Sequence, residues 1–139
     1  MNKICIIDGQ GGGIGAFVIK KLRETYDDSL ELIALGTNAI ATAQMLKAKA
    51  NRGASGENAI VQTVRQADLI IGPMGIVMAN AMMGEVTPKM AEAVASSPAK
   101  KLLLPLLQEN VVIVGTAAIP LPHLMDKLIE NHLKGLLFV

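Results

Sequence analysis

The stretch IIDGQGGGIG, residues 6–15, decides the fold of this chain, and five of its ten residues are glycine. The residues before it, 3–7, form a continuous apolar run that is too short for a helix and is typical of a strand buried on both faces. After it, apolar residues recur at helical spacing, at Ile14, Phe17, Val18 and Leu22. The stretch is therefore predicted to be a tight turn between a buried strand and an amphipathic helix.

The rest of the chain continues this alternation. Apolar runs predict further strands at residues 30–35, 68–71, 101–106 and 111–114. Helical spacing predicts helices at residues 39–50, 57–66, 86–97 and 120–134, and residues 51–56 are predicted to form a polar loop. Together these elements predict an α/β fold, a three-layer Rossmann-like doubly wound sheet of about five mostly parallel strands with helices on both faces. We expect one domain over residues 1–139.

Composition excludes several classes of protein. Of 139 residues, 51% are hydrophobic and 18% charged, which excludes a disordered chain. The 13 basic and 12 acidic residues nearly balance, and only three residues are aromatic, so we expect no nucleic-acid partner. The single cysteine excludes an intramolecular disulfide and a multi-cysteine zinc site.

Membrane insertion is not expected either. The apolar stretches are broken by glycine, proline or charge well before the roughly 20 residues that a membrane span needs. The first eight residues contain Lys3 and a short predicted strand that ends at Asp8, which is not the pattern of a signal peptide. We therefore expect a cytoplasmic protein.

The glycine-rich turn is the main candidate for a ligand site. In doubly wound folds ligands bind outside the carboxyl ends of the strands, and a glycine turn that leads into a helix presents N–H groups to an anion. Residues 11–16 match the dinucleotide pattern G-x-G-x-x-A, and residues 9–15 match the G-x-x-x-G-I-G loop of short-chain dehydrogenases. This predicts a phosphate or nucleotide cradle formed by Gly9, Gly11, Gly12, Gly13, Ile14 and Gly15. The alternative is a tight structural turn that binds nothing.

Other features argue against an ordinary dehydrogenase. A NAD site expects an acidic residue at the end of the second strand, whereas this position holds Gly36, Thr37 and Asn38. Thr37 and Asn38 could hydrogen-bond a ribose or a 2′-phosphate. The Tyr–Lys pair of short-chain dehydrogenases is missing, because the only tyrosine is Tyr26, and no G-x-x-x-x-G-K-[ST] loop is present. The cofactor is therefore left open, with NAD(P) or another nucleotide as the candidates.

Further candidate residues follow the other predicted strands. Asp8 directly precedes the glycines and either contacts magnesium, ribose or substrate, or caps the loop. Arg52 could clamp an anion, with Glu57 and Asn58 at the start of the next helix, although a solvated loop with ordinary caps explains these residues equally well. Gly72 and Pro73 follow the third predicted strand, on the expected ligand side. His123 and His132 are nine residues apart and do not have metal-ligand spacing, so no metal site is predicted.

Residues 74–85 are rich in methionine and are predicted to form a short buried helix or an interface element. Methionine fills irregular contacts and is common at adaptable surfaces. This gives the alternative function, a non-enzymatic homodimeric or partner-binding module joined through residues 74–84.

Five segments together resemble one known family: IIDGQGGGIG, IALGTNAIAT, ANRGASGENAI, IIGPMGIVMANAMMGEVTPKMAEAV and SSPAKKLLLPL. They are similar to the bacterial proteins grouped as domain of unknown function 3842, over roughly residues 3–115. The resemblance implies a small cytoplasmic Rossmann-like protein without an established activity, and it supplies no catalytic residues. The sequence thus predicts a protein that binds an anionic small molecule and leaves catalysis undecided.

Overall fold

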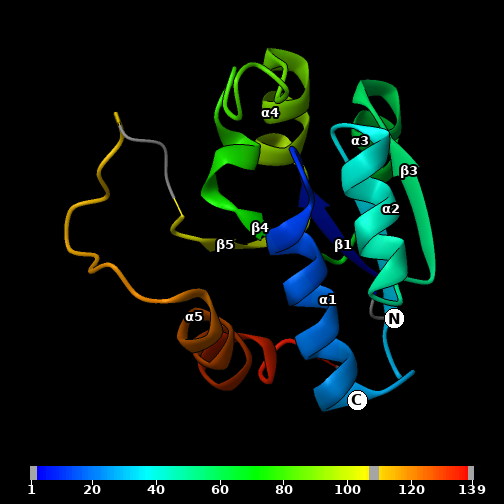
Figure 1. Cartoon of the computed structure of the whole chain (residues 1–139), viewed down its shortest axis with the longest axis vertical. Helices are drawn as coiled ribbons and strands as arrows, with labels where there is room; N and C mark the ends of the chain where they lie inside the picture. The colour runs from blue at the N-terminus through cyan, green and yellow to red at the C-terminus, as the bar shows by residue number, and fades with distance from the viewer. Residues whose placement is uncertain (1–2, 107–109, 138–139) are drawn as a thin grey trace.

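The computed structural model describes residues 3–106 and 110–137, in which strands and helices alternate (Figure 1). The strands are β1 (Lys3–Asp8), β2 (Glu31–Gly36), β3 (Arg52–Ser55), β4 (Leu69–Pro73) and β5 (Lys100–Leu104). The α-helices are α1 (Gly13–Tyr26), α2 (Ala39–Lys47), α3 (Glu57–Thr63), α4 (Pro88–Ser96) and α5 (Leu121–Lys127). Two 3-10 turns, η1 (Val64–Gln66) and η2 (Met74–Val77), and a π-helical segment, η3 (Leu128–Leu133), complete the set.

The strands form one parallel sheet in the order β3-β2-β1-β4-β5. The chain runs outward from β1 to β3, then returns to add β4 on the other side of β1. Strand order therefore reverses at β1, which creates the crevice where doubly wound folds bind ligands. The predicted fold class is confirmed, and the glycine-rich turn lies at this switch point.

Helices cover both faces of the sheet and bury a separate core on each. Ile4 and Ile6 of β1 belong to the core that contains α1, α2 and α5 side chains. Cys5 and Ile7 face the opposite core, under α3 and α4. Because side chains alternate along a strand, a strand covered on both faces is apolar at successive positions, as residues 4–7 are. Burial also raises the pKa of the Cys5 thiol to about 12.

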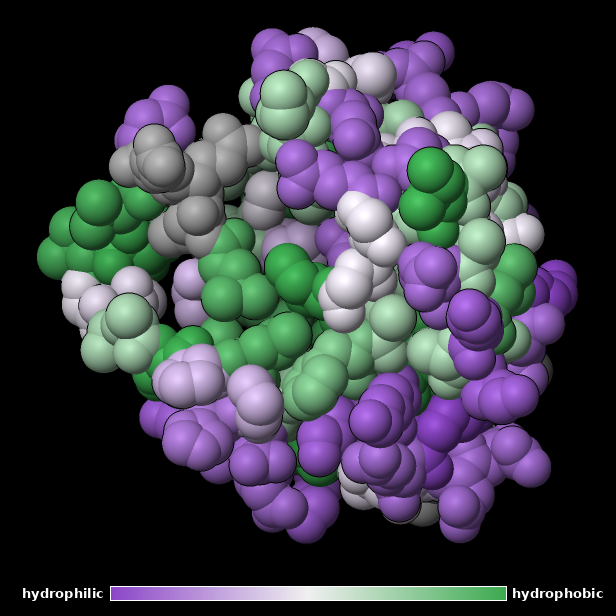
Figure 2. All heavy atoms as spheres, in the orientation of Figure 1, coloured by the Kyte–Doolittle hydropathy of each residue, from purple (hydrophilic) through white to green (hydrophobic). Residues whose placement is uncertain are grey.

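One predicted strand is wrong, and another was missed. Residues 111–114 contain no strand; Val112 and Val114 are 81% and 93% exposed, in a segment that extends away from the body (Figures 1 and 2). The fifth strand is instead β3, within the predicted 51–56 loop. Its RGAS sequence lacks apolar character because it is an edge strand held mainly by backbone pairing with β2.

The other elements largely follow the predicted pattern. The Thr87 hydroxyl caps α4 by accepting from the Met90 N–H, and Pro88 occupies the first turn, where it costs no hydrogen bond. The predicted 120–134 helix divides into α5 and the π-helical η3. Residues 74–85, predicted to be a short helix or interface element, form η2 and a series of tight turns. Among the described residues, no helix combines the length and apolar character needed to cross a bilayer.

Candidate functional site

The glycine-rich loop turns sharply between β1 and α1. The Gly12 N–H donates to the Gly9 carbonyl at 2.9 Å, and Gly12 itself adopts a left-handed φ of 75° as the residue that precedes α1. Glycine enters this region without steric cost, whereas other residues do so at about 1–2 kcal/mol. The loop ends where the N–H groups of the first turn of α1 have no helical partners.

Three of the five glycines are required by packing within the chain. A Cβ on Gly9 would lie 2.6 Å from both the Met82 sulfur and the Thr37 hydroxyl. A Cβ on Gly12 would lie 2.8 Å from the Ala41 backbone, and one on Gly15 would lie 2.5 Å from the Met45 sulfur. These glycines let α2 and the methionine-rich segment approach the loop closely, so a structural role accounts for them.

The other two glycines have no such explanation. Among residues 3–106 and 110–137, a Cβ on Gly11 or on Gly13 would meet no atom within 4 Å, and neither glycine has a positive φ. Both residues are exposed, and within the described part of the chain no hydrogen bond uses either N–H as donor. Gly11 and Gly13 thus leave an open stretch of backbone, facing outward at the start of α1.

Asp8 lies beneath this open backbone and caps the loop. It is 3% exposed, and its two carboxylate oxygens accept from the Gly9 N–H at 2.8 Å and the Gly15 N–H at 2.7 Å. Burial raises the pKa of the Asp8 carboxyl, against the lowering effect of N–H groups from Gly15, Gly9 and Ile14. Of the two roles expected for Asp8, capping is the one that these contacts show.

Residues after β2 meet an acidic side chain from a distant part of the chain. Glu85 Oε1 accepts from the Gln10 N–H at 2.7 Å, the Thr37 hydroxyl at 2.8 Å and the Asn38 amide at 2.9 Å. These donors, with Gln10 the strongest, lower the pKa of the Glu85 carboxyl. A carboxylate therefore lies at the end of β2, and it comes from the segment after β4.

Sequence reasoning missed this role of Glu85. The residue is separated from Gln10 by 75 positions, and its only signal was a charge within an apolar, methionine-rich stretch. The segment that carries it has left-handed φ values at Asn80, Met82, Met83 and Gly84. Such backbone is costly outside glycine, and it bends the segment back over the loop.

The remaining predicted residues at the carboxyl ends of the strands mainly make contacts that hold the fold together. A Cβ on Gly36 would lie 2.6 Å from the Asn38 carbonyl, and the Gly36 N–H donates to the Thr42 hydroxyl at 3.1 Å. The Asn38 side chain also caps α2 by accepting from the Ala41 N–H. A Cβ on Gly72 would lie 2.9 Å from an Ile76 methyl group. Pro73, Gly72 and Gly36 are all buried.

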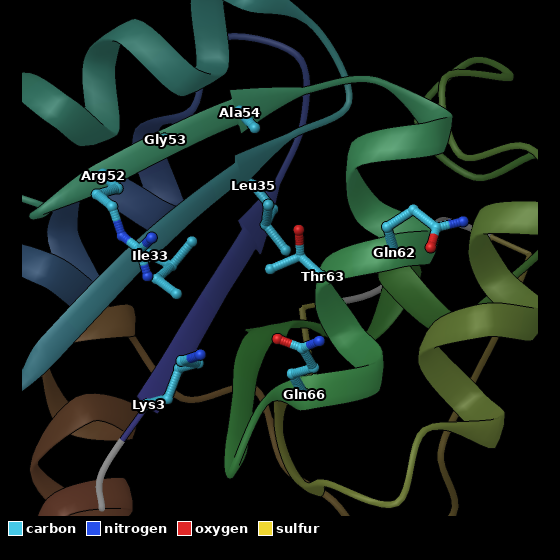
Figure 3. A pocket seen from close by; sticks show the side chains of 9 residues that line it. All are labelled: Lys3, Ile33, Leu35, Arg52, Gly53, Ala54, Gln62, Thr63 and Gln66. Atoms are coloured by element: carbon cyan, nitrogen blue, oxygen red, sulfur yellow. The ribbon is translucent and has the colours of Figure 1, made fainter.

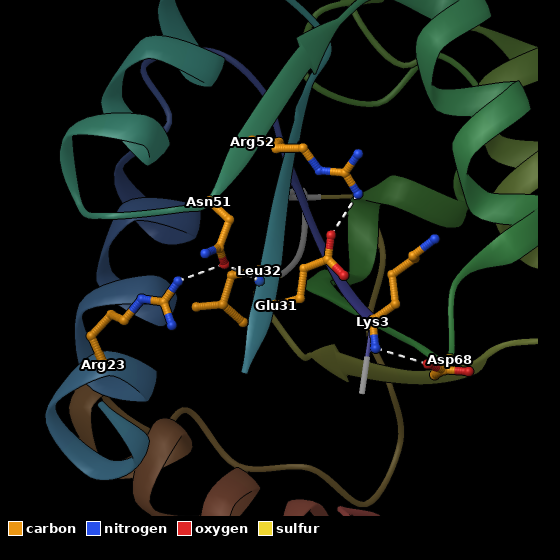
Figure 4. Close-up of polar contacts among 7 residues, drawn as sticks. All are labelled: Lys3, Arg23, Glu31, Leu32, Asn51, Arg52 and Asp68. Carbon is orange, nitrogen blue, oxygen red and sulfur yellow. Dashed lines mark hydrogen bonds and ion pairs between the residues drawn. The ribbon is translucent and has the colours of Figure 1, made fainter. Parts of the chain in front are cut away.

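Arg52 lies elsewhere. It opens β3 rather than a ligand-side loop, beside Ile33, and its guanidinium pairs with Glu31 at 2.5 Å (Figure 4). It is three residues before Ser55, which lies beside Gly36, so about 10 Å of strand separates it from the carboxyl edge. Residues 52–55, predicted to lie in a loop, form a strand, and Arg52 lies at its far end from the glycine loop. A role of Arg52 in binding an anion stays a prediction.

The other two residues of that set lie on α3. Glu57 accepts from the Thr87 hydroxyl at 2.6 Å and so ties α3 to the start of α4. Asn58 is exposed on the first turn of α3. Neither residue contacts the glycine loop through a hydrogen bond among the described residues.

A hollow lies on the α3 side of the sheet, away from the glycine loop (Figure 3). It has a volume of about 430 Å³, an apolar floor from β2 and β3, and a polar rim from α3 and η1. Its lining residues are Lys3, Ile33, Leu35, Arg52, Gly53, Ala54, Gln62, Thr63 and Gln66. The described residues include no group of three or more His, Cys, Asp or Glu side chains that could hold a metal ion.

Comparison with known families agrees with the resemblance drawn from the sequence. The model of a domain of unknown function, DUF3842, matches residues 3–136. The chain belongs to this family. No curated protein matches the chain.

Proposed function

We propose that this protein binds a nucleotide, a dinucleotide or another phosphorylated metabolite at the glycine-rich loop. The observation that carries the proposal is the open backbone of Gly11 and Gly13. The fold accounts for Gly9, Gly12 and Gly15, whereas none of the residues that the structure describes fills the space that side chains at 11 and 13 would take. A phosphate there would accept hydrogen bonds from backbone N–H groups at the positive end of the α1 dipole.

The position in the fold supports the same conclusion. The loop lies at the carboxyl end of β1, where strand order reverses, which is the usual ligand crevice of doubly wound sheets. Residues 8–15, 36–42, 55–58 and 72–87 contain no lysine or arginine. Backbone N–H groups are therefore the main donors available to a phosphate at this edge.

The first test is a thermal-shift screen of the purified protein against NAD, NADP, ATP, GTP, coenzyme A, flavins and sugar phosphates. A ligand at 100 times its dissociation constant should add about 2.7 kcal/mol to the free energy of unfolding. The Gly13→Val variant should lose this shift, because its side chain fills the open space, and it should keep the wild-type melting temperature to within a few degrees.

Thr25→Val is the matched control, since it places the same side chain at an exposed position of α1. It should retain the ligand shift in full. Normal binding by Gly13→Val would show that the phosphate does not occupy this backbone. The absence of any shift in the whole screen would favour the homodimeric module through residues 74–84, which light scattering would then test.

A further inference from the structure

The carboxylate of Glu85 meets the glycine loop and the end of β2 from a distant part of the chain. It is carried by a segment with four left-handed residues, and it is anchored at the junction of the glycine loop and the end of β2. We propose that Glu85 binds the ribose diol of the nucleotide and selects ligands whose 2′-hydroxyl is free. The inference rests on the proposed nucleotide function and names its ligand class.

The two oxygens of this carboxylate have different surroundings. Oε1 accepts all three hydrogen bonds, from Gln10, Thr37 and Asn38. Within the described part of the chain, Oε2 accepts none. One oxygen therefore fixes the orientation of the group, and the other remains available to accept a hydroxyl. Hydrogen bonds to an ionised acceptor are among the stronger ones in proteins.

The location fits a ribose. In doubly wound folds the phosphate lies on the first loop and the ribose lies between that loop and the end of the second strand. Glu85 joins these two places directly, since its donors are Gln10 in the loop and Thr37 and Asn38 after β2. The sequence predicts that Thr37 and Asn38 hydrogen-bond a ribose directly. In the structure the Thr37 hydroxyl and the Asn38 amide each donate a hydrogen bond to Glu85 instead.

The negative charge of Glu85 at the carboxyl ends of the strands gives the selectivity against a 2′-phosphate. A 2′-phosphate would lie beside the Glu85 carboxylate, and residues 8–15, 36–42, 55–58 and 72–87 offer no lysine or arginine to neutralise it. Arg52, the nearest candidate from sequence, is paired with Glu31 at the other end of β3. Unscreened like charges at short range disfavour binding.

The experiment is isothermal titration of the full chain with four probes: NAD, NADP, ADP and 2′-deoxy-ADP. The wild-type protein should bind NAD at least about tenfold more tightly than NADP, and ADP about tenfold more tightly than 2′-deoxy-ADP, as expected for about 1.4 kcal/mol per discriminating contact. In Glu85→Gln both ratios should fall towards one. Glu92→Gln, an exposed change on α4, should leave both ratios unchanged.

Gly13→Val separates this inference from the proposed function, because it should weaken all four probes and leave the two ratios unchanged. If the wild-type protein binds none of these four probes but gives a thermal shift with a sugar phosphate, a flavin or coenzyme A, only the role of Glu85 fails. Silence in both experiments overturns both proposals. If the wild-type protein binds the four probes without distinguishing 2′-hydroxyl from 2′-phosphate, only the role of Glu85 is overturned. Tighter binding of every probe by Glu85→Gln would also overturn it, since the carboxylate would then be covering the site.

Thr37→Val provides a second variant in case Glu85→Gln lowers the folded fraction. It keeps the carboxylate and removes one of its three anchors. Both ratios should then shrink by a factor of a few, with the melting temperature recorded for each variant. Unchanged ratios in Thr37→Val, together with a folded Glu85→Gln that also keeps them, would contradict the inference.

Discussion

The two ends of the parallel strands, called here the carboxyl edge and the amino edge of the sheet, use polar groups in opposite ways. At the carboxyl ends of the strands, the carboxylates of Asp8 and Glu85 accept mostly from backbone N–H groups, and residues 8–15, 36–42, 55–58 and 72–87 contain no lysine or arginine. At the amino edge, long charged side chains pair with one another in solvent, as Arg52 does with Glu31 (Figure 4). The first arrangement depends on close backbone packing, whereas the second is tolerant of change.

Glycine is what lets the carboxyl ends of the strands pack closely against neighbouring elements. Gly9, Gly12 and Gly15 bring the loop against neighbouring elements at distances that no Cβ would allow. Ion pairs on exposed side chains add little by comparison, typically less than about 1 kcal/mol each. Substitutions at the two edges should therefore differ strongly in their effect on the free energy of unfolding.

The largest effect is expected for Gly12→Ala. The new Cβ would meet the Ala41 backbone at 2.8 Å in a left-handed conformation. Strain and overpacking together should lower the free energy of unfolding by about 2–5 kcal/mol, measured by urea denaturation. Gly11→Ala, one residue away in open space, should change it by less than about 0.5 kcal/mol. Equal losses in the two variants would remove the distinction between packed and open glycines.

Asp8→Asn should have the next largest effect. An amide can accept at only one of the two positions that now receive the Gly9 and Gly15 N–H groups. The free energy of unfolding should fall by about 1–3 kcal/mol, the usual cost of a buried unsatisfied group. Thermal unfolding of both proteins at several pH values would measure the difference.

The pH dependence of that difference tests the cause of the pKa shift. Burial raises the pKa of Asp8, so the folded protein holds its proton at pH values where the unfolded chain has released it. The contribution of Asp8 to the free energy of unfolding therefore falls as pH rises from about 4 through the raised pKa. Asp8→Asn has no ionisable group at this position, so its free energy of unfolding does not fall for this reason. The difference between the two proteins should be largest at low pH and shrink as pH rises. A difference that grows with pH would mean that the N–H groups outweigh burial.

The smallest effect is expected at the amino edge. Arg52→Ala removes an exposed ion pair and should lower the free energy of unfolding by less than about 1 kcal/mol, with a smaller effect at high salt. It should leave ligand binding at the glycine loop unchanged, because Arg52 lies at the opposite end of β3. A large loss of nucleotide affinity in this variant would place the ligand in the Figure 3 hollow instead.

Most of the fold followed from local patterns, and the errors have specific causes. Buried strands such as β1 and β4 contain continuous apolar runs, residues 4–7 and 69–71, and are recognised without tertiary information. Edge strand β3 is polar and glycine-containing, since it is paired on one side only, and it was predicted to be a loop. Residues 111–114 have the composition of a strand but no partner strand in the described structure.

By itself, the sequence determined the strand–turn–helix unit, the parallel α/β class and the position of the candidate site at the end of β1. Those features depend on periodicity and on contacts within a few residues. Only the tertiary structure decided which glycines are packed and which are open, and it alone brought Glu85 to Gln10 across 75 positions. The physical reason is that such contacts depend on how separate elements pack together, which leaves no local pattern in the chain.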